Sequence, residues 1–282
     1  MLYIIEDRTT SLSNGGRCLK KLNLMLIQNK KMEERYERNR LYIDSEEQKK
    51  IKDYPIILGG SGIGSVIAEC ALRLGFENIT IIDGDEVELS NLNRQNYTEK
   101  DIQLSKVKAL YSRLKNINSE ANIKIYNAFI NKDNIEGFIK GHKIAINALD
   151  FASDIPLEFD RICKENDIPV IHPYNLGWGG LVMILTSDSI DLSAISKENE
   201  KINELTIVEY MSSRIKLSKA PQNWIDQIIE KYKSEKVVLS PPQLSIASWT
   251  VAAMCTHLLF NIATGKEVKK FPEYYFSTIL NS

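Results

Sequence analysis

The segment that decides the fold is Pro55-Ile-Ile-Leu58, followed by Gly59-Gly60-Ser61-Gly62-Ile63-Gly64. The apolar run is typical of a buried strand, the glycines indicate a tight turn, and apolar residues at helical spacing continue to Gly75. A strand that enters a glycine turn and a helix can hold a phosphate, because the backbone comes close and the helix start presents free N–H groups. The pattern indicates a nucleotide site, although a doubly wound sheet with a tight turn and no ligand produces it too.

Strands and helices continue to alternate on the carboxyl side of this segment, which predicts an α/β fold with a Rossmann-like, doubly wound and mainly parallel sheet. Residues 187–240 are polar with amphipathic patches and predict a helical insertion that could cover a site. We expect residues 1–34 to be an N-terminal segment with a hairpin turn at Asn14-Gly15-Gly16, and residues 35–282 to be the nucleotide-binding domain. The expected strands are 55–58, 78–82, 123–126, 143–147, 169–172, 180–186 and 274–280, and the expected helices are 33–52, 63–75, 105–114, 156–166 and 241–265.

The composition excludes several classes of protein. The 282 residues carry 36 Lys and Arg against 37 Asp and Glu, so the net charge of −1 provides no broad field for nucleic acid or an anionic membrane. The four cysteines form no Cys-x-x-Cys pair, so no structural zinc is expected. The apolar stretch 244–263 contains several polar residues and predicts a buried core helix rather than a membrane span. No signal peptide is visible, and we expect a cytoplasmic protein.

Acidic residues follow two of the expected strands. Asp83, 19 residues after Gly64, lies where a carboxylate would accept the ribose hydroxyls of a nucleotide. Asp150 ends the strand at 143–147, at the same edge of the sheet, and could hold Mg²⁺. These positions favour an adenosine nucleotide but do not separate NAD from ATP.

The segment Ser90-Asn91-Leu92-Asn93-Arg94-Gln95, together with Lys106, favours ATP. A dinucleotide needs one or two cations, whereas attack of a carboxylate at the α-phosphorus of ATP adds negative charge beside a triphosphate and needs more. Arg94 can bind phosphate oxygens bidentately, Lys106 can act as a point charge, and the two asparagines can donate hydrogen bonds. Each of the two cations taken alone could equally be a solvated surface charge.

The glycine turn, Ile81-Ile-Asp-Gly-Asp85, Ser90-Asn-Leu-Asn-Arg-Gln95, Ser105-Lys106 and Ala148-Leu-Asp150 resemble, in this order and spacing, the ThiF/MoeB/HesA family of bacterial relatives of ubiquitin-activating enzymes. The resemblance covers about residues 34–186 and, more weakly, 241–265. It implies an adenylyltransferase that uses ATP and Mg²⁺ to convert a C-terminal carboxylate into an acyl-adenylate.

The resemblance also implies a role for each site residue. Asp83 would hold the ribose, Asn91, Arg94 and Lys106 the phosphates, and Asp150 the metal, while Gln95 would support its own loop. The implied cofactor-binding residues are Gly59, Gly60, Gly62, Gly64, Asp83, Asp85, Asn91, Asn93 and Gln95, and the implied catalytic residues are Arg38, Arg94, Lys106 and Asp150.

Arg35-Tyr36-Glu37-Arg38 is similar to a short element that precedes the glycine turn in this family. There the second arginine reaches into the ATP site of the partner subunit, which implies that Arg38 acts in trans and that the chain is a homodimer. An ion pair of Arg38 with Glu33 or Glu34 on the same helix is an equally good interpretation.

Two departures from the family pattern affect what can be carried over. Ser61 stands where the family usually has a glycine, so the nucleotide could bind differently or more weakly. No cysteine lies between Cys163 and Cys255, where thioester-forming relatives keep their nucleophile. Cys70, Cys163 and Cys255 have apolar surroundings typical of core residues, so covalent thioester transfer is disfavoured.

The loop from His172 to Gly180 follows a strand and should lie at the ligand edge of the sheet. Its glycines could let a peptide tail lie against the backbone, with Tyr174 and Trp178 as walls. For Trp178 we favour the alternative, in which the indole fills the core. His172 could act as an acid or base, but an ionised carboxylate needs none to attack ATP.

These observations predict an ATP-dependent adenylyltransferase that activates a small ubiquitin-like sulfur-carrier protein without a thioester cysteine. The segment 1–34 is too short for a recognition domain of ordinary size, which places adenylation of a ribosomally made peptide second. Two other classes stay open: an NAD-dependent oxidoreductase with His172 as acid and base, and a non-catalytic nucleotide-binding subunit, which only Ser61 supports.

Overall fold

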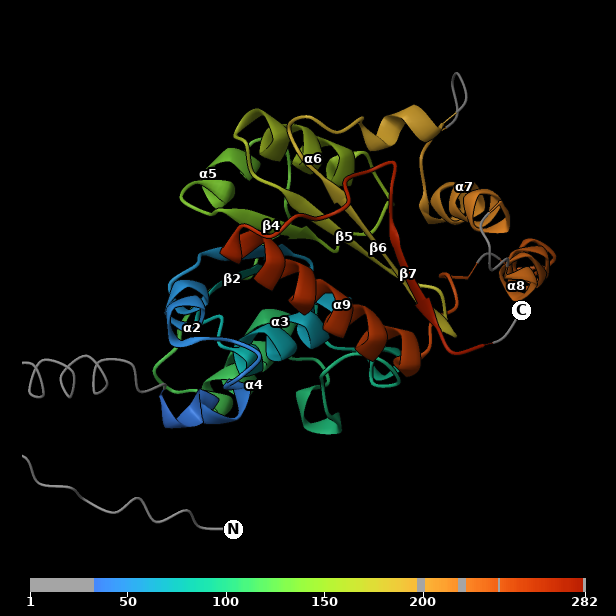
Figure 1. Cartoon of the computed structure of the whole chain (residues 1–282). Coiled ribbons are helices and arrows are strands. Elements are labelled where there is room, and N and C mark those ends of the chain that lie inside the picture. Colours follow the sequence, from blue (N-terminus) through green and yellow to red (C-terminus); the bar gives the residue numbers. More distant parts are fainter. Residues whose placement is uncertain (1–32, 197–200, 218–221, 238, 281–282) are drawn as a thin grey trace, which may run out of the picture. The chain divides into compact units, whose positions relative to one another are not determined.

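The computed structural model describes residues 33–196, 201–217, 222–237 and 239–280 (Figure 1). The chain divides into two compact units between Lys49 and Lys50. The described part of the first unit contains η1 (Glu34–Asn39), a 3₁₀ helix, and the start of α2 (Ser45–Lys52). The single helix expected over 33–52 is wrong, because the chain leaves helical geometry at Leu41, whose φ is 76°. The expected turn at 14–16 lies outside the described residues.

The second unit is built on a seven-stranded sheet with the order β3-β2-β1-β4-β5-β6-β7. The first five strands in this order are parallel, and β6 and β7 pair antiparallel with their neighbours. The doubly wound, mainly parallel sheet is therefore confirmed. The strands are β1 (Ile56–Gly59), β2 (Asn78–Ile82), β3 (Asn122–Tyr126), β4 (Ile144–Asn147), β5 (Val170–Asn175), β6 (Gly179–Leu185) and β7 (Tyr275–Thr278).

Helices cover both faces of the sheet. One face carries α3 (Ile63–Leu74), α4 (Lys106–Ile117) and α9 (Ser245–Thr264), and the other carries α5 (Ile135–Ile139) and α6 (Ile155–Glu165) (Figure 1). Central strands covered on both sides are apolar throughout, and Ile56, Ile57 and Leu58 of β1 are fully buried. Each such side chain stabilises the fold by about 1.5–3 kcal/mol relative to exposure. The remaining helices are η2 (Leu89–Asn91), η3 (Glu99–Asp101), η4 (Leu192–Ile195), α7 (Glu204–Lys216) and α8 (Asn223–Lys233).

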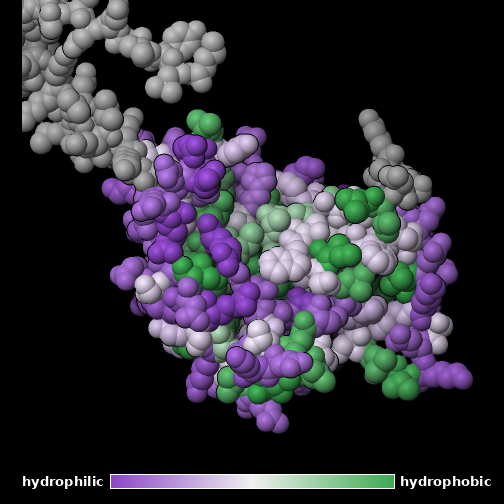
Figure 2. Space-filling view, turned by 90° about the horizontal axis from the view of Figure 1, so that it is seen from below, coloured by the Kyte–Doolittle hydropathy of each residue, from purple (hydrophilic) through white to green (hydrophobic). Residues whose placement is uncertain are grey.

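By length and composition, α9 could cross a membrane. Its buried side, however, packs against α3, β5 and β6, which is the core position expected from the sequence. It ends at Gly265, whose φ of 79° is the left-handed geometry of a helix C-cap. The hydrophobic residues on the face drawn in Figure 2 form separate patches among hydrophilic ones.

The described part of 187–240 is largely helical, as expected, with η4, α7 and α8. Ile207 and Met211 of α7 are fully buried in the core cluster beside the sheet. Ile215 of α7 forms a smaller cluster with Ile225 and Ile229 of α8. The insertion is therefore packed onto the sheet domain through the buried face of α7.

Candidate nucleotide site

The carboxyl ends of β1, β2 and β4 lie side by side and present the glycine turn, Asp83 and Asp150 at one edge of the sheet. The strand order changes direction between β1 and β4, and ligands of doubly wound sheets bind at such a point. The structure therefore brings Asp83, Asp150 and the glycine turn together, as expected from the sequence.

The turn after β1 needs glycine at one position above all. Gly60 has a φ of 91°, and a Cβ on it would lie 2.3 Å from the carbonyl oxygen of Ala148. A Cβ on Gly62 would lie 3.3 Å from Gln95 Nε2, so Gln95 lies against the glycine turn; its expected support of its own loop stays a prediction. A Cβ on Gly64 would make only ordinary contacts. Gly60 is thus required because its backbone lies against that of Ala148, whereas a side chain at position 62 would need the Gln95 amide to shift by a few tenths of an ångström.

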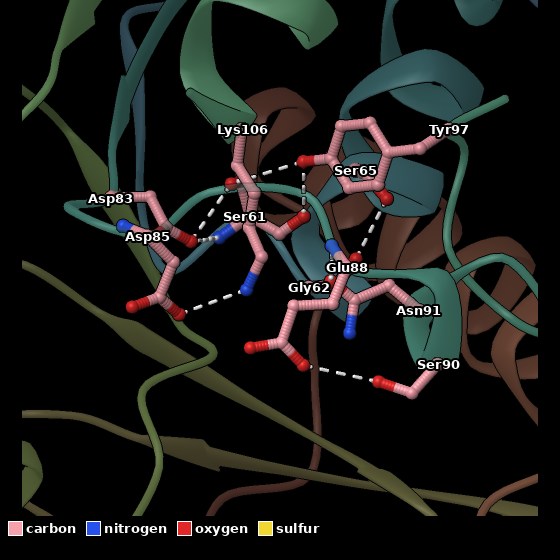
Figure 3. Close-up of polar contacts among 10 residues, drawn as sticks. All are labelled: Ser61, Gly62, Ser65, Asp83, Asp85, Glu88, Ser90, Asn91, Tyr97 and Lys106. Carbon is pink, nitrogen blue, oxygen red and sulfur yellow. Dashed lines mark hydrogen bonds and ion pairs between the residues drawn. The ribbon is translucent and has the colours of Figure 1, made fainter. Parts of the chain in front are cut away.

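Ser61 is fully buried and forms hydrogen bonds with Asp83 (Figure 3). Its backbone N–H and its hydroxyl donate to Asp83 Oδ2 at 2.6 and 2.8 Å, and the Tyr97 hydroxyl donates to the Ser61 carbonyl oxygen at 2.8 Å. Asp83 Oδ1 accepts the N–H of Asp85 at 2.8 Å. Asp83 therefore fixes the glycine turn, and a carboxylate with about four acceptor sites has one left for a ribose hydroxyl. The unusual serine is part of this network.

Lys106 begins α4 and is almost completely buried. Its Nζ donates to Asp85 Oδ2 at 2.8 Å (Figure 3), and its backbone N–H donates to the Asp85 carbonyl oxygen at 2.9 Å. The expected phosphate ligand is therefore held by a carboxylate of the same site. A phosphate would have to compete with Asp85 or share the ammonium group with it.

Arg94 lies beside the segment that leads into α9. Its Nε donates to Gln243 Oε1 at 2.6 Å, and its Nη1 donates to the Ser90 carbonyl oxygen and to Asn93 Oδ1, each at 2.9 Å. Asn93 Nδ2 also donates to the Gln243 carbonyl oxygen at 3.3 Å. Partial burial lowers the pKa of Arg94, and the Asp150 carboxylate opposes that shift. The guanidinium is oriented by neutral acceptors and keeps its charge.

Asn91 closes η2 and is buried. Its Oδ1 accepts the N–H of Glu88 at 3.0 Å, while its Nδ2 has no hydrogen-bond partner in the part of the chain that the structure describes. The residue has a structural role and still has a donor for a ligand.

Asp150 follows β4 and is accessible to solvent. Partial desolvation raises the pKa of Asp150, the negative charge of Glu204 raises it further, and Lys106 lowers it. Glu204 is the first residue of α7, and its Oε1 accepts the N–H of Phe151 at 2.8 Å. Among the described residues, no three His, Cys, Asp or Glu side chains lie close enough together to hold a metal ion.

Three cysteines lie in the described ranges: Cys163 and Cys255 are fully buried in the core, and Cys70 is partly buried. Burial raises the pKa of the thiols of Cys70, Cys163 and Cys255. A thiol whose pKa is raised is a poor nucleophile, since the thiolate is the reactive form.

Arg38 belongs to the other compact unit, so its position relative to this edge is not defined. It is exposed, and it has no ion pair within the described ranges. Arg35 makes the ion pair with Glu33 instead, at 3.7 Å. The intrahelical ion pair considered for Arg38 is therefore absent, and the proposed action in trans stays a prediction.

A model of the ThiF family matches residues 36–280. The chain belongs to the ThiF family. The resemblance that the motifs carried is thereby confirmed, together with the fold it implied.

This ThiF-family chain matches curated relatives over only part of their length. The ThiS adenylyltransferase of Bacillus subtilis (strain 168), which is named for a sulfur carrier protein, is 32% identical over 161 residues, 55% of this chain and 48% of that protein. The tRNA threonylcarbamoyladenosine dehydratase of Escherichia coli (strain K12) is 31% identical over 117 residues, 41% of this chain and 43% of that protein. The chain thus spans less than half the length of these two relatives.

A similar solved structure is that of E. coli MccB with ATP. It has a TM-score of 0.63 and 18% identity, and the match covers 97% of this chain and 81% of that one. At this identity the likeness supports the fold alone.

Membership in the ThiF family leaves no support for the oxidoreductase hypothesis, which depended on His172. His172 is only 1% exposed, and its Nε2 lies 2.8 Å from Asp160 Oδ1 in a buried pair. The expected core position of Trp178 is wrong, because its side chain is 46% exposed in the turn between β5 and β6. Tyr174 is the aromatic residue of this loop that is buried.

Two residues of the site could not be found from the sequence. Glu204 lies 53 residues after its partner Phe151, and Gln243 lies 149 residues after Arg94. Neither belongs to a motif, and only the packing of α7 and α9 brings them to the edge.

The contact of Gln243 with Arg94 leads to a test in this ThiF-family site. We expect Gln243→Ala to weaken binding of ATP·Mg²⁺ about tenfold, because the guanidinium loses the acceptor that orients it. Gln243→Glu should weaken it further, since the new carboxylate pairs with Arg94 and competes with phosphate. Calorimetric titration measures both, with Gln227→Ala on the exposed side of α8 as the control. Unchanged affinity in both Gln243 variants would contradict the assignment.

Proposed function

We propose that the protein is an ATP-dependent adenylyltransferase that activates a C-terminal carboxylate as an acyl-adenylate. The observation that carries the proposal is that Arg94, Lys106 and Asp150 lie at the edge of the sheet where the glycine turn and Asp83 also lie. The name of the B. subtilis relative, an adenylyltransferase, supports the reaction class.

The donor set fits the reactants. The turn at Gly60 and Gly62 leaves the start of α3 free of side-chain caps, and free N–H groups at a helix start attract phosphate. Asp83 has one acceptor site for ribose, and Asp150 offers an accessible carboxylate to Mg²⁺. When bound, Mg²⁺ would neutralise phosphate charge.

The chain's own residues act by positioning and charge. A carboxylate oxygen of the substrate attacks the α-phosphorus, the bond between the α-phosphorus and the bridging oxygen breaks, and pyrophosphate leaves with the electron pair. Arg94 binds phosphate oxygens with Nη2, while Gln243 holds Nε and the Ser90 carbonyl oxygen and Asn93 hold Nη1. Lys106 shifts from Asp85 toward the phosphates as negative charge builds up there. No general base is required, since the attacking carboxylate is ionised at neutral pH.

For the acyl substrate we propose a small ubiquitin-like sulfur-carrier protein, on the name of the relative that is 32% identical. A ribosomally made peptide is the second candidate, and the exposed Trp178 at the same edge favours any substrate with an extended tail. The raised thiol pKa values favour release of the adenylate, or attack on it by another molecule, over a thioester on the enzyme.

Pyrophosphate exchange tests the function. We expect the protein with its carrier to incorporate labelled pyrophosphate into ATP, and calorimetry to detect ATP binding that needs Mg²⁺. NAD⁺ and NADH serve as controls, and binding of these cofactors in place of ATP would overturn the proposal. ATP binding without exchange for any carrier or peptide would point to the non-catalytic subunit instead.

A further inference from the structure

Glu204 belongs to the helical insertion and contacts the segment that carries Asp150 of the candidate nucleotide site. It is the first residue of α7, and the Asn203 side chain caps this helix by accepting the N–H of Thr206 at 2.9 Å. One turn further on, Ile207 is fully buried in the same core cluster as Phe151. The side-chain cap and the buried Ile207 therefore hold the half-buried Glu204 in position.

The contact that Glu204 makes is on the backbone beside Asp150. Glu204 Oε1 accepts the N–H of Phe151 at 2.8 Å. On the other side of Asp150, the Ala148 N–H donates to the Gly59 carbonyl oxygen at 2.8 Å. The segment that carries Asp150 is thus held by β1 before it and by the insertion after it.

The charges around Asp150 are unbalanced. Asp83, Asp85, Asp150 and Glu204 are carboxylates, while Arg94 and Lys106 are the cations of the same edge. The surplus of negative charge favours a divalent cation at Asp150, which is exposed to solvent and makes no ion pair with either cation. Glu204 contributes to this surplus without donating or accepting a hydrogen bond at Asp150 itself.

We propose that Glu204 is a positioning residue for Asp150, which fixes the backbone beside that carboxylate and adds a charge that strengthens its hold on a divalent cation. The inference rests on the proposed function, because the cation in question is the one that accompanies ATP. It gives the insertion a part in the reaction, since its first helix supplies a residue that acts through Asp150.

Two substitutions separate the two effects. Glu204→Ala removes both the acceptor and the charge, and Glu204→Gln keeps an acceptor for the Phe151 N–H but removes the charge. Glu209→Gln makes the same chemical change further along α7, where Glu209 pairs with Lys233 of α8, and is the matched control. A purely structural Glu204 would stabilise the start of α7 through the helix dipole and do nothing else.

The readouts are Mn²⁺ affinity in the presence of α,β-methylene ATP, measured by electron paramagnetic resonance, and hydrogen exchange of the Phe151 amide without nucleotide. We expect about tenfold weaker Mn²⁺ binding in Glu204→Gln and up to about a hundredfold in Glu204→Ala, as for other residues that orient metal ligands. Exchange at Phe151 should accelerate in Glu204→Ala and stay slow in Glu204→Gln. Glu209→Gln should match the wild type in both.

Two results would overturn the proposal in distinguishable ways. Wild-type protein that binds no Mn²⁺ with nucleotide would overturn the proposed function, and this inference with it. If the wild type binds Mn²⁺ and both Glu204 variants bind it with the same affinity, with only a lower melting temperature, the proposed function stands. Glu204 would then be a structural residue.

Discussion

Replacing Arg94 by alanine is expected to lower pyrophosphate exchange by a factor of about a thousand, the loss typical of a charge that stabilises transferring phosphate. Arg94 makes no ion pair within the described ranges, and its hydrogen-bond partners Gln243, Ser90 and Asn93 are neutral acceptors. Lys106, in contrast, is already paired with Asp85. Arg94 therefore has no hydrogen-bonded counter-ion when a triphosphate arrives, although the Asp150 carboxylate acts on it through space.

Arg94→Lys should recover only part of the lost activity, because lysine keeps the charge but not the planar fork that binds two oxygens at once. Arg161→Ala, which removes an exposed arginine paired with Glu158 and Glu165 on α6, controls for loss of charge elsewhere. Thermal unfolding checks that Arg94→Ala stays folded, since its hydrogen bonds are each worth about 1 kcal/mol. If Arg94→Ala keeps more than a tenth of the exchange activity, its assignment to the phosphates is wrong.

Local patterns in the sequence were sufficient to predict the positions of most strands of the sheet. The bounds of β2 are those expected, 78–82, because a β-branched run there lies between Gly75 and Asp83. The helix after the glycine turn ends at Gly75, as predicted, since that residue has a φ of 125° that suits glycine. The antiparallel direction of β6 and β7 had no local signal. For β6 that direction follows from the short turn at 176–178, which cannot cross over the sheet, so β6 pairs directly with β5.

In the candidate site, too, some features could be predicted from local sequence patterns and others could not. Asp83 and Asp150 could be placed at one edge because parallel strands bring their carboxyl ends together whatever the details of packing. Other contacts of the site could not be predicted. The ion pair of Lys106 with Asp85 and the hydrogen bond of Ser61 to Asp83 depend on side-chain rotamers. The hydrogen bonds of Gln243 to Arg94 and of Glu204 to Phe151 depend on helices that lie far along the chain. The spacing of these residues in the sequence does not predict their contacts.

Two inactive variants are expected to regain activity when they are mixed, if Arg38 completes the site of a partner subunit. Arg38→Ala and Arg94→Ala should each lose exchange activity by about a thousandfold as homodimers. In a heterodimer one site carries both lesions, and the other combines the Arg94 of one chain with the Arg38 of its partner and is intact. With random pairing, half of the dimers are mixed and half of their sites work, so roughly a quarter of the wild-type activity should return.

The control for this experiment is a mixture of Arg94→Ala with Lys106→Ala. Both residues lie at the same edge of one chain, where Arg94 follows η2 and Lys106 begins α4, so every site in their heterodimer keeps one lesion and no activity should return. Light scattering during gel filtration must show a dimer in each mixture. Recovery in the first mixture alone would assign Arg38 to the site of the partner subunit. Dimers without recovery would assign Arg38 to its own chain, and an active Arg38→Ala homodimer would remove it from the site altogether.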